Sequence, residues 1–476
     1  MSNPCKTVAN RPSPWLCGSL AVLVLAGCAV GPGYVPPEPS ALPAWHGELK
    51  NGLAAQPADP NALASWWKAL DDPQLSGLIE RAVAGNLDLK DAQARVRQAR
   101  AARGVTKAGL FPTVNLSGSD TWSHSRGELG TGRTTENHHL GFDAGWELDL
   151  FGGVRRAVEA ADADLQAGQE ELNDTLVSLL SEVALNYVQI RTCQTQLAAV
   201  QASLESQEQT YQLTEWQHQA QLSDELAVHQ AKYNLESTRS QIPDLKSALN
   251  EAMNNLAVLL GEQPGALHEE LAAPAPVPVC AGEVAVGVPA DVLRQRPDVR
   301  KAERQLAAQT ARIGVAMADR YPRFSLTGSI GGQAMSLVSG TSATISGGPQ
   351  VTWAIFDGDV IRWNIEQQNA LQEQYLIQYE SAILNALEEV ENAMTAYVNE
   401  QDRRRTLEAA ADAAQRAAEL ALYEYQAGLT DFSDVLDAQR SLLSFQNQLA
   451  ESNGAVTSNL IRLYKALGGG WTPLHS

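Results

Sequence analysis

The sequence predicts a mainly α-helical chain that also contributes four strands to a membrane β-barrel, built as a tandem repeat. Three observations lead to this fold class. Residues 359–427 form a 69-residue stretch without a Gly or a Pro, the two strongest breakers of a helix. Two regions, residues 114–150 and 324–355, alternate apolar and polar residues with the period of a strand. The same motifs also return in the same order about two hundred residues later.

The stretch 359–427 is the longest predicted helix. Its apolar residues recur at steps of three or four, which is the spacing of a coiled-coil seam. The seam consists of Leu376, Tyr379, Ile383, Leu387, Val390, Met394 and Tyr397. At 1.5 Å per residue this helix is about 100 Å long, and a compact domain offers no surface of that length. Helices of this kind are therefore expected to pack side by side, as a tube or a rod.

Four segments predict strands. The apolar residues of the first pair are Val114, Leu116, Leu140, Phe142, Ala144, Trp146, Leu148 and Leu150. Those of the second pair are Phe324, Leu326, Ile330 and Ala334, then Ile345, Val351, Trp353 and Ile355. An apolar face opposite a polar face is typical of a strand between lipid and water. A half-buried strand of a soluble protein gives the same alternation, so this pattern alone leaves both interpretations open.

The two halves of the chain correspond motif by motif. Phe111-Pro112 returns 210 positions later as Tyr321-Pro322, and Leu222-Ser223-Asp224 returns 207 positions later as Leu429-Thr430-Asp431. Each half therefore predicts one helix, two strands and two long helices. In the first half we expect helices over residues 74–107, 154–219 and 225–260, with a kink or break at Pro243. The expected divisions are a first repeat at 73–263, a linker at 264–288, a second repeat at 289–470 and a short tail at 471–476.

The first residues predict an exported lipoprotein. Lys6 and Arg11 precede an apolar run at 15–26 that is too short to span a membrane, which is typical of a signal peptide over residues 1–27. The run ends in Leu25-Ala26-Gly27-Cys28, which resembles the lipobox of bacterial lipoproteins. That resemblance makes Cys28 the acylated first residue of an extended N-terminal segment, 28–72. Ala29, rather than Asp, implies sorting to the outer membrane.

Composition excludes several classes of function. The mature chain would carry a net charge near −22, which argues against nucleic acid as a partner. Such an acidic surface either favours cations or is simply solvated. Of the remaining cysteines, Cys193 and Cys280, we expect two isolated thiols, although an oxidising periplasm permits a disulfide.

No catalytic motif is present. The sequence contains no GxxxxGK[ST], HExxH, GxSxG or CxxC motif, so neither an enzyme nor a cofactor is predicted. His124, His138 and His139 fall in or beside the predicted loop between the first two strands. Three histidines in a solvated loop more often bind nothing than a metal, so no metal site is expected.

Four strands per chain require partners. A sheet in lipid cannot leave an edge unpaired, and membrane barrels need at least about eight strands. Two copies would close a narrow barrel filled with side chains, whereas three would give twelve strands with a lumen. Twelve long helices could continue twelve strands, so the counting favours a trimer.

The residues also resemble a known family, the TolC-type outer-membrane efflux proteins, in the lipoprotein branch that includes OprM and NodT. The resemblance covers nearly the whole mature chain. Its most specific segments are Trp66-Trp67 with Asp72-Pro73-Gln74-Leu75, residues 294–303, Pro322 with Ser325-Leu326-Thr327-Gly328, and residues 435–442. It implies a homotrimer in which a 12-stranded outer-membrane β-barrel is continued by a long periplasmic α-helical barrel. It also implies export of drugs, toxic solutes or metal ions, together with a periplasmic adaptor and an inner-membrane pump, and no catalysis.

The resemblance also implies a gate at the periplasmic tip, where the two long helices of each repeat turn. Asp434 and Asp437 match the acidic positions that ring the family's aperture, and Tyr425 matches a tyrosine that ties neighbouring helices. Arg440 matches an arginine of the lipoprotein branch. Two positions depart from the family, since Thr430 replaces a gate arginine and Ala227 replaces an aspartate of some members. Asp434 also suits an ordinary helix N-terminus.

Two alternatives stay open from the sequence. One is an outlet for type I protein secretion, which shares the tube. The other is a structural coiled-coil lipoprotein without a pore, but this leaves the repeated strand pairs unexplained. The exported compound itself is not encoded here, because the pump selects it.

Overall fold

The computed structural model describes residues 29–37, 44–57, 59–126, 132–280, 282–335 and 341–471, so the predicted acylation site Cys28 lies outside the described residues. The chain forms two compact units. We call them the strand unit, Met1–Pro37, Val96–Gly168 and Lys301–Tyr379, and the helix unit, Glu38–Arg95, Gln169–Arg300 and Glu380–Ser476. Each is described by itself below.

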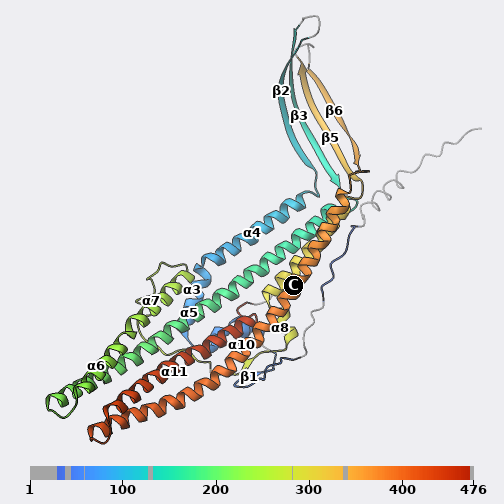
Figure 1. Ribbon diagram of the computed structural model, residues 1–476. Helices are drawn as coiled ribbons and strands as arrows, with labels where there is room; N and C mark the ends of the chain where they lie inside the picture. Colours follow the sequence, from blue (N-terminus) through green and yellow to red (C-terminus); the bar gives the residue numbers. More distant parts are fainter. Residues whose placement is uncertain are drawn as a thin grey trace, which may run out of the picture. The chain divides into compact units, whose positions relative to one another are not determined.

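The strand unit contains one antiparallel sheet in the order β2-β3-β5-β6 (Figure 1). Its strands are β2 (Thr113–Arg126), β3 (Gly132–Leu148), β5 (Arg323–Met335) and β6 (Thr341–Thr352). Phe142 pairs with Leu116 on one side and with Ile330 on the other, and Ile330 pairs with Ile345. Since paired residues in an antiparallel sheet share a face, the register brings the apolar positions of both repeats onto one side.

Both repeats attach their strands to helices in the same way. The helices that enter or leave the sheet are α4 (Leu87–Ala108), α5 (Gly153–Gln219), α9 (Pro297–Ala318) and α10 (Val360–Gln426). The Trp146 indole donates a hydrogen bond to the Leu110 carbonyl at 3.0 Å, and the Trp353 indole donates one to the Arg320 carbonyl at 3.1 Å. Equivalent tryptophans thus fix equivalent ends of the two hairpins.

Residues 29–37 lie against the strand unit. The Val30 amide donates to the Phe151 carbonyl at 3.0 Å, and Arg156 donates to the carbonyls of Val30 and Gly31 at 3.1 and 3.2 Å. Tyr34 donates to Glu303 at 3.1 Å. Gly31 lies so close to Gly314 that a Cβ on Gly31 would come within 2.5 Å of the Gly314 Cα.

The helix unit packs paired helices around an apolar core. Its further elements are β1 (Leu53–Ala54), α2 (Pro60–Ala64), the 3-10 helix η1 (Trp66–Leu70), α3 (Pro73–Gly85), α6 (Glu225–Arg239), α7 (Gln241–Leu259), β4 (Val284–Ala285), α8 (Pro289–Gln295) and α11 (Phe432–Ala466). Trp66, only 1% exposed, stacks on Tyr464 with ring centroids 5.4 Å apart. Within the described part of the chain, no helix is both long and apolar enough to cross a membrane.

The structure corrects several expected elements. The helix expected over 74–107 is broken at Asn86, whose side chain accepts from the Leu89 amide at 2.8 Å and donates to the Leu259 carbonyl at 2.9 Å. The segment 264–288, expected as a linker, contains the two-residue strand β4, which pairs in parallel with β1. The fourth strand ends at Thr352, before Trp353 and Ile355.

The break predicted at Pro243 is confirmed, since α6 ends at Arg239, the residue whose carbonyl a proline ring would meet.

Candidate functional site

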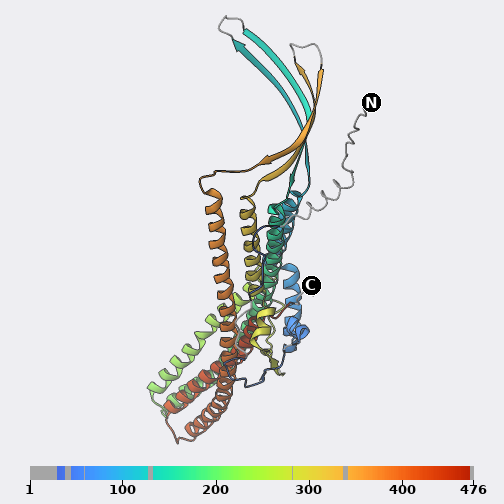
Figure 2. The same cartoon turned by 90° about the vertical axis from the view of Figure 1, so that its right-hand side faces the viewer.

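The helix unit carries both predicted helix turns at the same end (Figures 1 and 2). One turn joins α5 to α6, and the other joins α10 to α11. Behind them lies a small apolar cluster of Ala227, Ala231, Phe432, Val435 and Leu436, all buried. Ala227 is therefore a packing residue, and a carboxylate at this position would be buried among apolar side chains.

Tyr425 lies in the last turn of α10. Its hydroxyl donates to the Gln217 side chain on α5 at 2.6 Å. Its ring lies 5.2 Å from that of Phe432, at an angle of 54°. The structure thus places Tyr425 between two helices, whereas its part in closing a gate remains a prediction.

Thr430 and Asp434 interact with each other. Thr430 donates a hydrogen bond to the Asp434 carboxylate, which lies exposed in the first turn of α11. The two turns differ here, because Asp224 accepts from the Leu226 amide to cap α6, while Asp431 makes no side-chain cap bond to α11. Thr430 therefore makes a neutral contact that holds the Asp434 side chain in place.

Arg440 is held mainly by α6. It donates to Asn234 at 2.9 Å and to the Tyr233 hydroxyl, and its guanidinium lies 5.1 Å from the centre of the Tyr233 ring. Asp437 is 3.8 Å away and its side chain is 79% exposed. Sequence reasoning named Arg440 and Asp437 but missed Tyr233. Arg440 and Tyr233 are 207 positions apart, which is the repeat offset, so they occupy equivalent positions on α11 and α6. This signal would have predicted that the two residues lie at the same height along the paired helices.

A polar cavity of about 380 Å³ adjoins Arg440. It lies between α5, the α6–α7 segment and α11, and its wall includes Gln207, Asn234 and Asn447. Gln207 and Asn234 are 2% and 3% exposed. Each of the three amide groups has one buried atom that finds no hydrogen-bond partner among the described residues.

Large apolar side chains are exposed at both turns. Leu222 and Leu429 are 80% and 76% exposed, and Trp216 and Tyr423 are 63% and 69% exposed. Leu222 and Leu429 are equivalent in the repeat, as are Trp216 and Tyr423. Exposed apolar side chains therefore recur at equivalent positions of the two turns.

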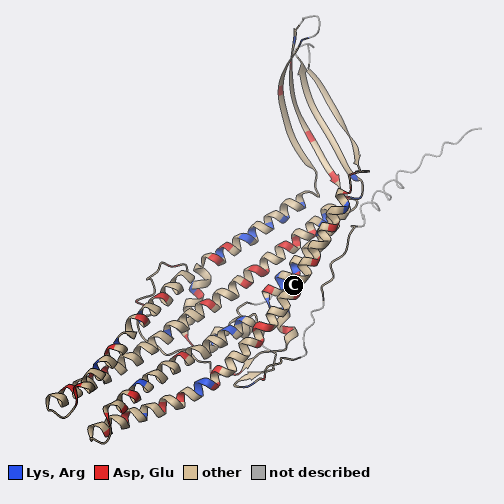
Figure 3. Cartoon of the chain, viewed as in Figure 1, with Lys and Arg blue, Asp and Glu red and all other residues tan. Residues whose placement is uncertain are grey.

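In the strand unit, the sheet has two chemically different faces. The apolar face carries Val114, Leu116, Leu140, Phe142, Trp146, Leu148, Phe324, Leu326, Ile330, Ile345 and Val351. From Leu148 to Leu140 it extends about 26 Å at roughly 3.3 Å per residue, close to the apolar band of about 25 Å in outer-membrane barrels. Figure 3 shows that the strands carry few charged residues.

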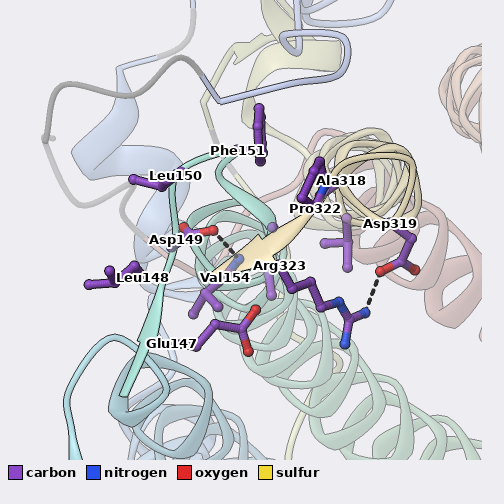
Figure 4. Close-up of a pocket in the computed structure, with 13 residues that line it drawn as sticks. Glu147, Leu148, Asp149, Leu150, Phe151, Val154, Ala318, Asp319, Pro322 and Arg323 are labelled. Atoms are coloured by element: carbon purple, nitrogen blue, oxygen red, sulfur yellow. Dashed lines mark hydrogen bonds and ion pairs between the residues drawn. The ribbon is translucent and has the colours of Figure 1, made fainter. Parts of the chain in front are cut away.

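A pocket of about 250 Å³ lies where β3 meets α5, beside the end of α9 (Figure 4). Asp149 accepts from the amides of Val154 and Arg155 at 3.1 and 2.9 Å and so caps α5. Arg323 pairs with Asp319 on the other side of the pocket. These interactions connect the ends of the strands to the helices beside them.

The three histidines, which were expected in or beside the loop between the first two strands, lie in the two strands that this connection joins. His124 belongs to β2, and His138 and His139 belong to β3. His138 pairs with Asp120 at 3.1 Å, and the His124 ring contacts Thr134 at 3.0 Å. Among the described residues, no group of three or more His, Cys, Asp or Glu side chains could hold a metal ion. Cys193, which is buried, and Cys280 are both free thiols.

The sheet has one apolar face that suits contact with lipid, and in each repeat long paired helices follow the strands. This combination is typical of channel proteins of the cell envelope. Comparison with known proteins agrees. The model of the family described as outer membrane efflux protein matches residues 78–262 and 288–469. Nodulation protein T of Rhizobium leguminosarum bv. trifolii is 35% identical over 95% of this chain and 96% of its own. The cation efflux system protein CusC of Escherichia coli O6:H1 is 33% identical over 98% and 99%.

A solved structure of the outer-membrane channel OprN shares the fold, with a TM-score of 0.86 and 35% identity over 94% of this chain and 100% of that one. The chain therefore belongs to the outer membrane efflux protein family. It is an outer-membrane efflux channel with a helical extension into the periplasm, and it is not an enzyme.

Proposed function

We propose that three copies of this chain close a twelve-stranded barrel and export small molecules as the outer-membrane channel of a tripartite pump. The two-faced sheet with two open edges carries this proposal. β2 and β6 each have one neighbour within the chain, and strand edges in lipid must be paired. The β6 edge of one copy paired with the β2 edge of the next would satisfy both edges in a closed ring.

The helix turns are the gate in this proposal. Three-fold symmetry repeats Asp434 and Asp437 around the axis, which gives carboxylate rings that attract cations and repel one another. Each copy contributes one Arg440, which lies 3.8 Å from Asp437, so this single positive charge offsets at most one of the two carboxylates. The closed tip is then held by contacts such as Tyr425 to Gln217 rather than by a salt bridge at position 430.

The exposed leucines and aromatic residues at the turns support docking of a periplasmic adaptor, which links the channel to an inner-membrane pump. Because the pump selects the substrate, drugs, toxic solutes and metal ions all remain within the proposed range. CusC belongs to a cation efflux system by its name, which favours cations as one substrate class to test first.

The first experiment is the mass of the full-length protein extracted in detergent, corrected for bound detergent. Three chains are expected. A mass of one chain would contradict barrel closure by this route.

The second experiment tests the gate in planar bilayers. Replacing Asp434→Ala together with Asp437→Ala should raise conductance or lower cation preference, because the carboxylate rings are gone. Asp412→Ala, an exposed acidic position of α10 away from the turns, is the matched control. Unchanged currents in the double variant would remove both residues from the gate.

A further inference from the structure

The polar face of the sheet is almost uncharged. It is built from small polar residues and glycines, among them Ser117, Ser119, Thr327, Ser329, Gly331 and Ser346. Among its described positions, the side chains charged at neutral pH are Arg133 near the distal hairpin, Asp143 midway, and Glu147 and Arg323 at the helical end. Glu147 and Arg323 line the same pocket, and Arg323 is also paired with Asp319. Asp143 therefore stands apart from the other charges of this face.

The surroundings of Asp143 leave its carboxylate projecting. Gly141 and Gly145 flank it along β3 on the same face, and Asn115 and Ser329 are its partners across the strands. Ser117 donates a hydrogen bond to its Oδ2 at 2.7 Å, which steadies the side chain without neutralising it. No lysine or arginine among the described residues pairs with it. Asp143 is therefore the one negatively charged side chain among the neutral glycine and serine residues that surround it on this part of the polar face.

We propose that Asp143 determines the preference for small inorganic cations in the strand section of the channel, separately from the helix turns. The proposal rests on the proposed function, since it requires three copies to close with their polar faces inward. Three-fold symmetry then sets three Asp143 carboxylates at one height in a lumen lined by neutral groups. Rings of carboxylates favour cations over anions at that level.

The test is the reversal potential of single channels of the full-length protein in planar bilayers under a KCl gradient. The background is Asp434→Ala with Asp437→Ala, so that these two carboxylates of the turns do not contribute to the ratio. In this background Asp143→Asn should lower the K⁺ to Cl⁻ permeability ratio by at least about fivefold, since one unit charge at close range has an effect of that order in water and the variant removes three. Asparagine is isosteric and can still accept from Ser117, so the fold is retained.

Two variants sharpen the result. Asp120→Asn removes a carboxylate of the same sheet but on the opposite face, where it lies 3.1 Å from His138. It should leave the ratio unchanged. Asp143→Glu keeps the charge and should keep the ratio close to that of the background protein.

Channels that open normally but show the same ratio with Asp143→Asn would overturn this assignment and leave the proposed function intact. An equal fall with Asp120→Asn would also overturn it, because the effect would then not depend on the polar face. Absence of any channel from the unmodified protein would refute the proposed function itself, and the role of Asp143 with it.

Discussion

Asp72 joins a helix start to the buried core of the helix unit. Its Oδ1 accepts from the Leu75 amide at 3.0 Å and caps α3, while its Oδ2 accepts from the buried Tyr187 hydroxyl at 2.8 Å. Arg191, 1% exposed, also donates to Tyr187. The Asp72-Pro73-Gln74-Leu75 motif therefore has a physical reason, since one carboxylate satisfies both a helix terminus and a buried phenol.

Asp72→Ala should lower the stability of the helix unit. The lost cap costs about 1 kcal/mol, and a buried hydroxyl deprived of its acceptor adds about 1–3 kcal/mol. The midpoint of thermal unfolding in detergent measures the effect. Asp59→Ala is the control, because Asp59 caps only the short α2 through the Asn61 amide. Equal shifts for the two variants would refute the special position of Asp72.

Tyrosine burial also predicts a loss of stability at high pH. Burial, followed by the hydrogen bond to Asp72, raises the pKa of Tyr187 to about 12, and burial raises the pKa of Tyr397 and Tyr464 as well. An unfolded tyrosine loses its proton near pH 10, so the unfolded state is favoured as pH rises from about 10 towards 12. Unfolding curves from pH 8 to 11 should show this fall, and Tyr187→Phe should reduce it. A flat profile would contradict the prediction.

At the scale of elements, the sequence predicted what depends on local pattern. The helix expected over 359–427 is α10, Val360–Gln426, because Gly358 precedes the stretch, Gly428 follows it and neither glycine nor proline interrupts it. The break at Asn86 has a local cause, since its side chain accepts from the Leu89 amide, and the pair Gly85-Asn86 is a local signal that the apolar spacing on either side concealed. It also has a tertiary cause. A Cβ on Gly85 would lie 2.1 Å from the Leu260 carbonyl, a contact distant in sequence. The outer part of β2 was missed too, because Asp120 and His124 interrupt the apolar alternation on their face.

The candidate site shows the same division. The repeat and the family resemblance pointed to Asp434, Asp437, Tyr425 and Arg440, but not to their partners. Gln217 contacts Tyr425 and Asn234 contacts Arg440 because their helices pack together. The sequence around a polar residue on a helix does not indicate which residue of another helix it will contact.

The N-terminal segment gives a prediction at the element scale. Gly31 has a φ of +95° and lies against Gly314, whereas a Cβ on Gly33 would meet nothing within 4 Å. Gly31→Ala should therefore release residues 29–37 from the strand unit, since both the backbone conformation and the space oppose a side chain. Faster proteolysis of the segment in folded protein measures this. Gly33→Ala is the matched control, and equal cleavage of both variants would refute the close contact.

At the scale of the whole molecule, membrane attachment has two predicted sources, the lipid on Cys28 and the barrel. Cys28→Ala should abolish labelling with a radioactive fatty acid, because the acylated thiol is gone. The variant should still form trimers, since the sheet edges are unchanged. Labelling that persists in the variant would contradict the lipobox.

The cavity beside Arg440 has a mechanical consequence. When α5 and α11 move apart, water reaches the unpaired amide atoms of Gln207 and Asn447, and this hydration offsets part of the packing that is lost. The repeat-related position of Gln207 on α10 is Ala414, which is buried and has no polar side-chain atom to hydrate. The same separation would break the buried hydrogen bond from Gln439 on α11 to Thr210 on α5. Polar groups therefore both join α5 to α11 and become hydrated when they part, whereas α10 presents alanine at the equivalent level, so the two hairpins of one chain are chemically unequal despite their shared origin in a repeat.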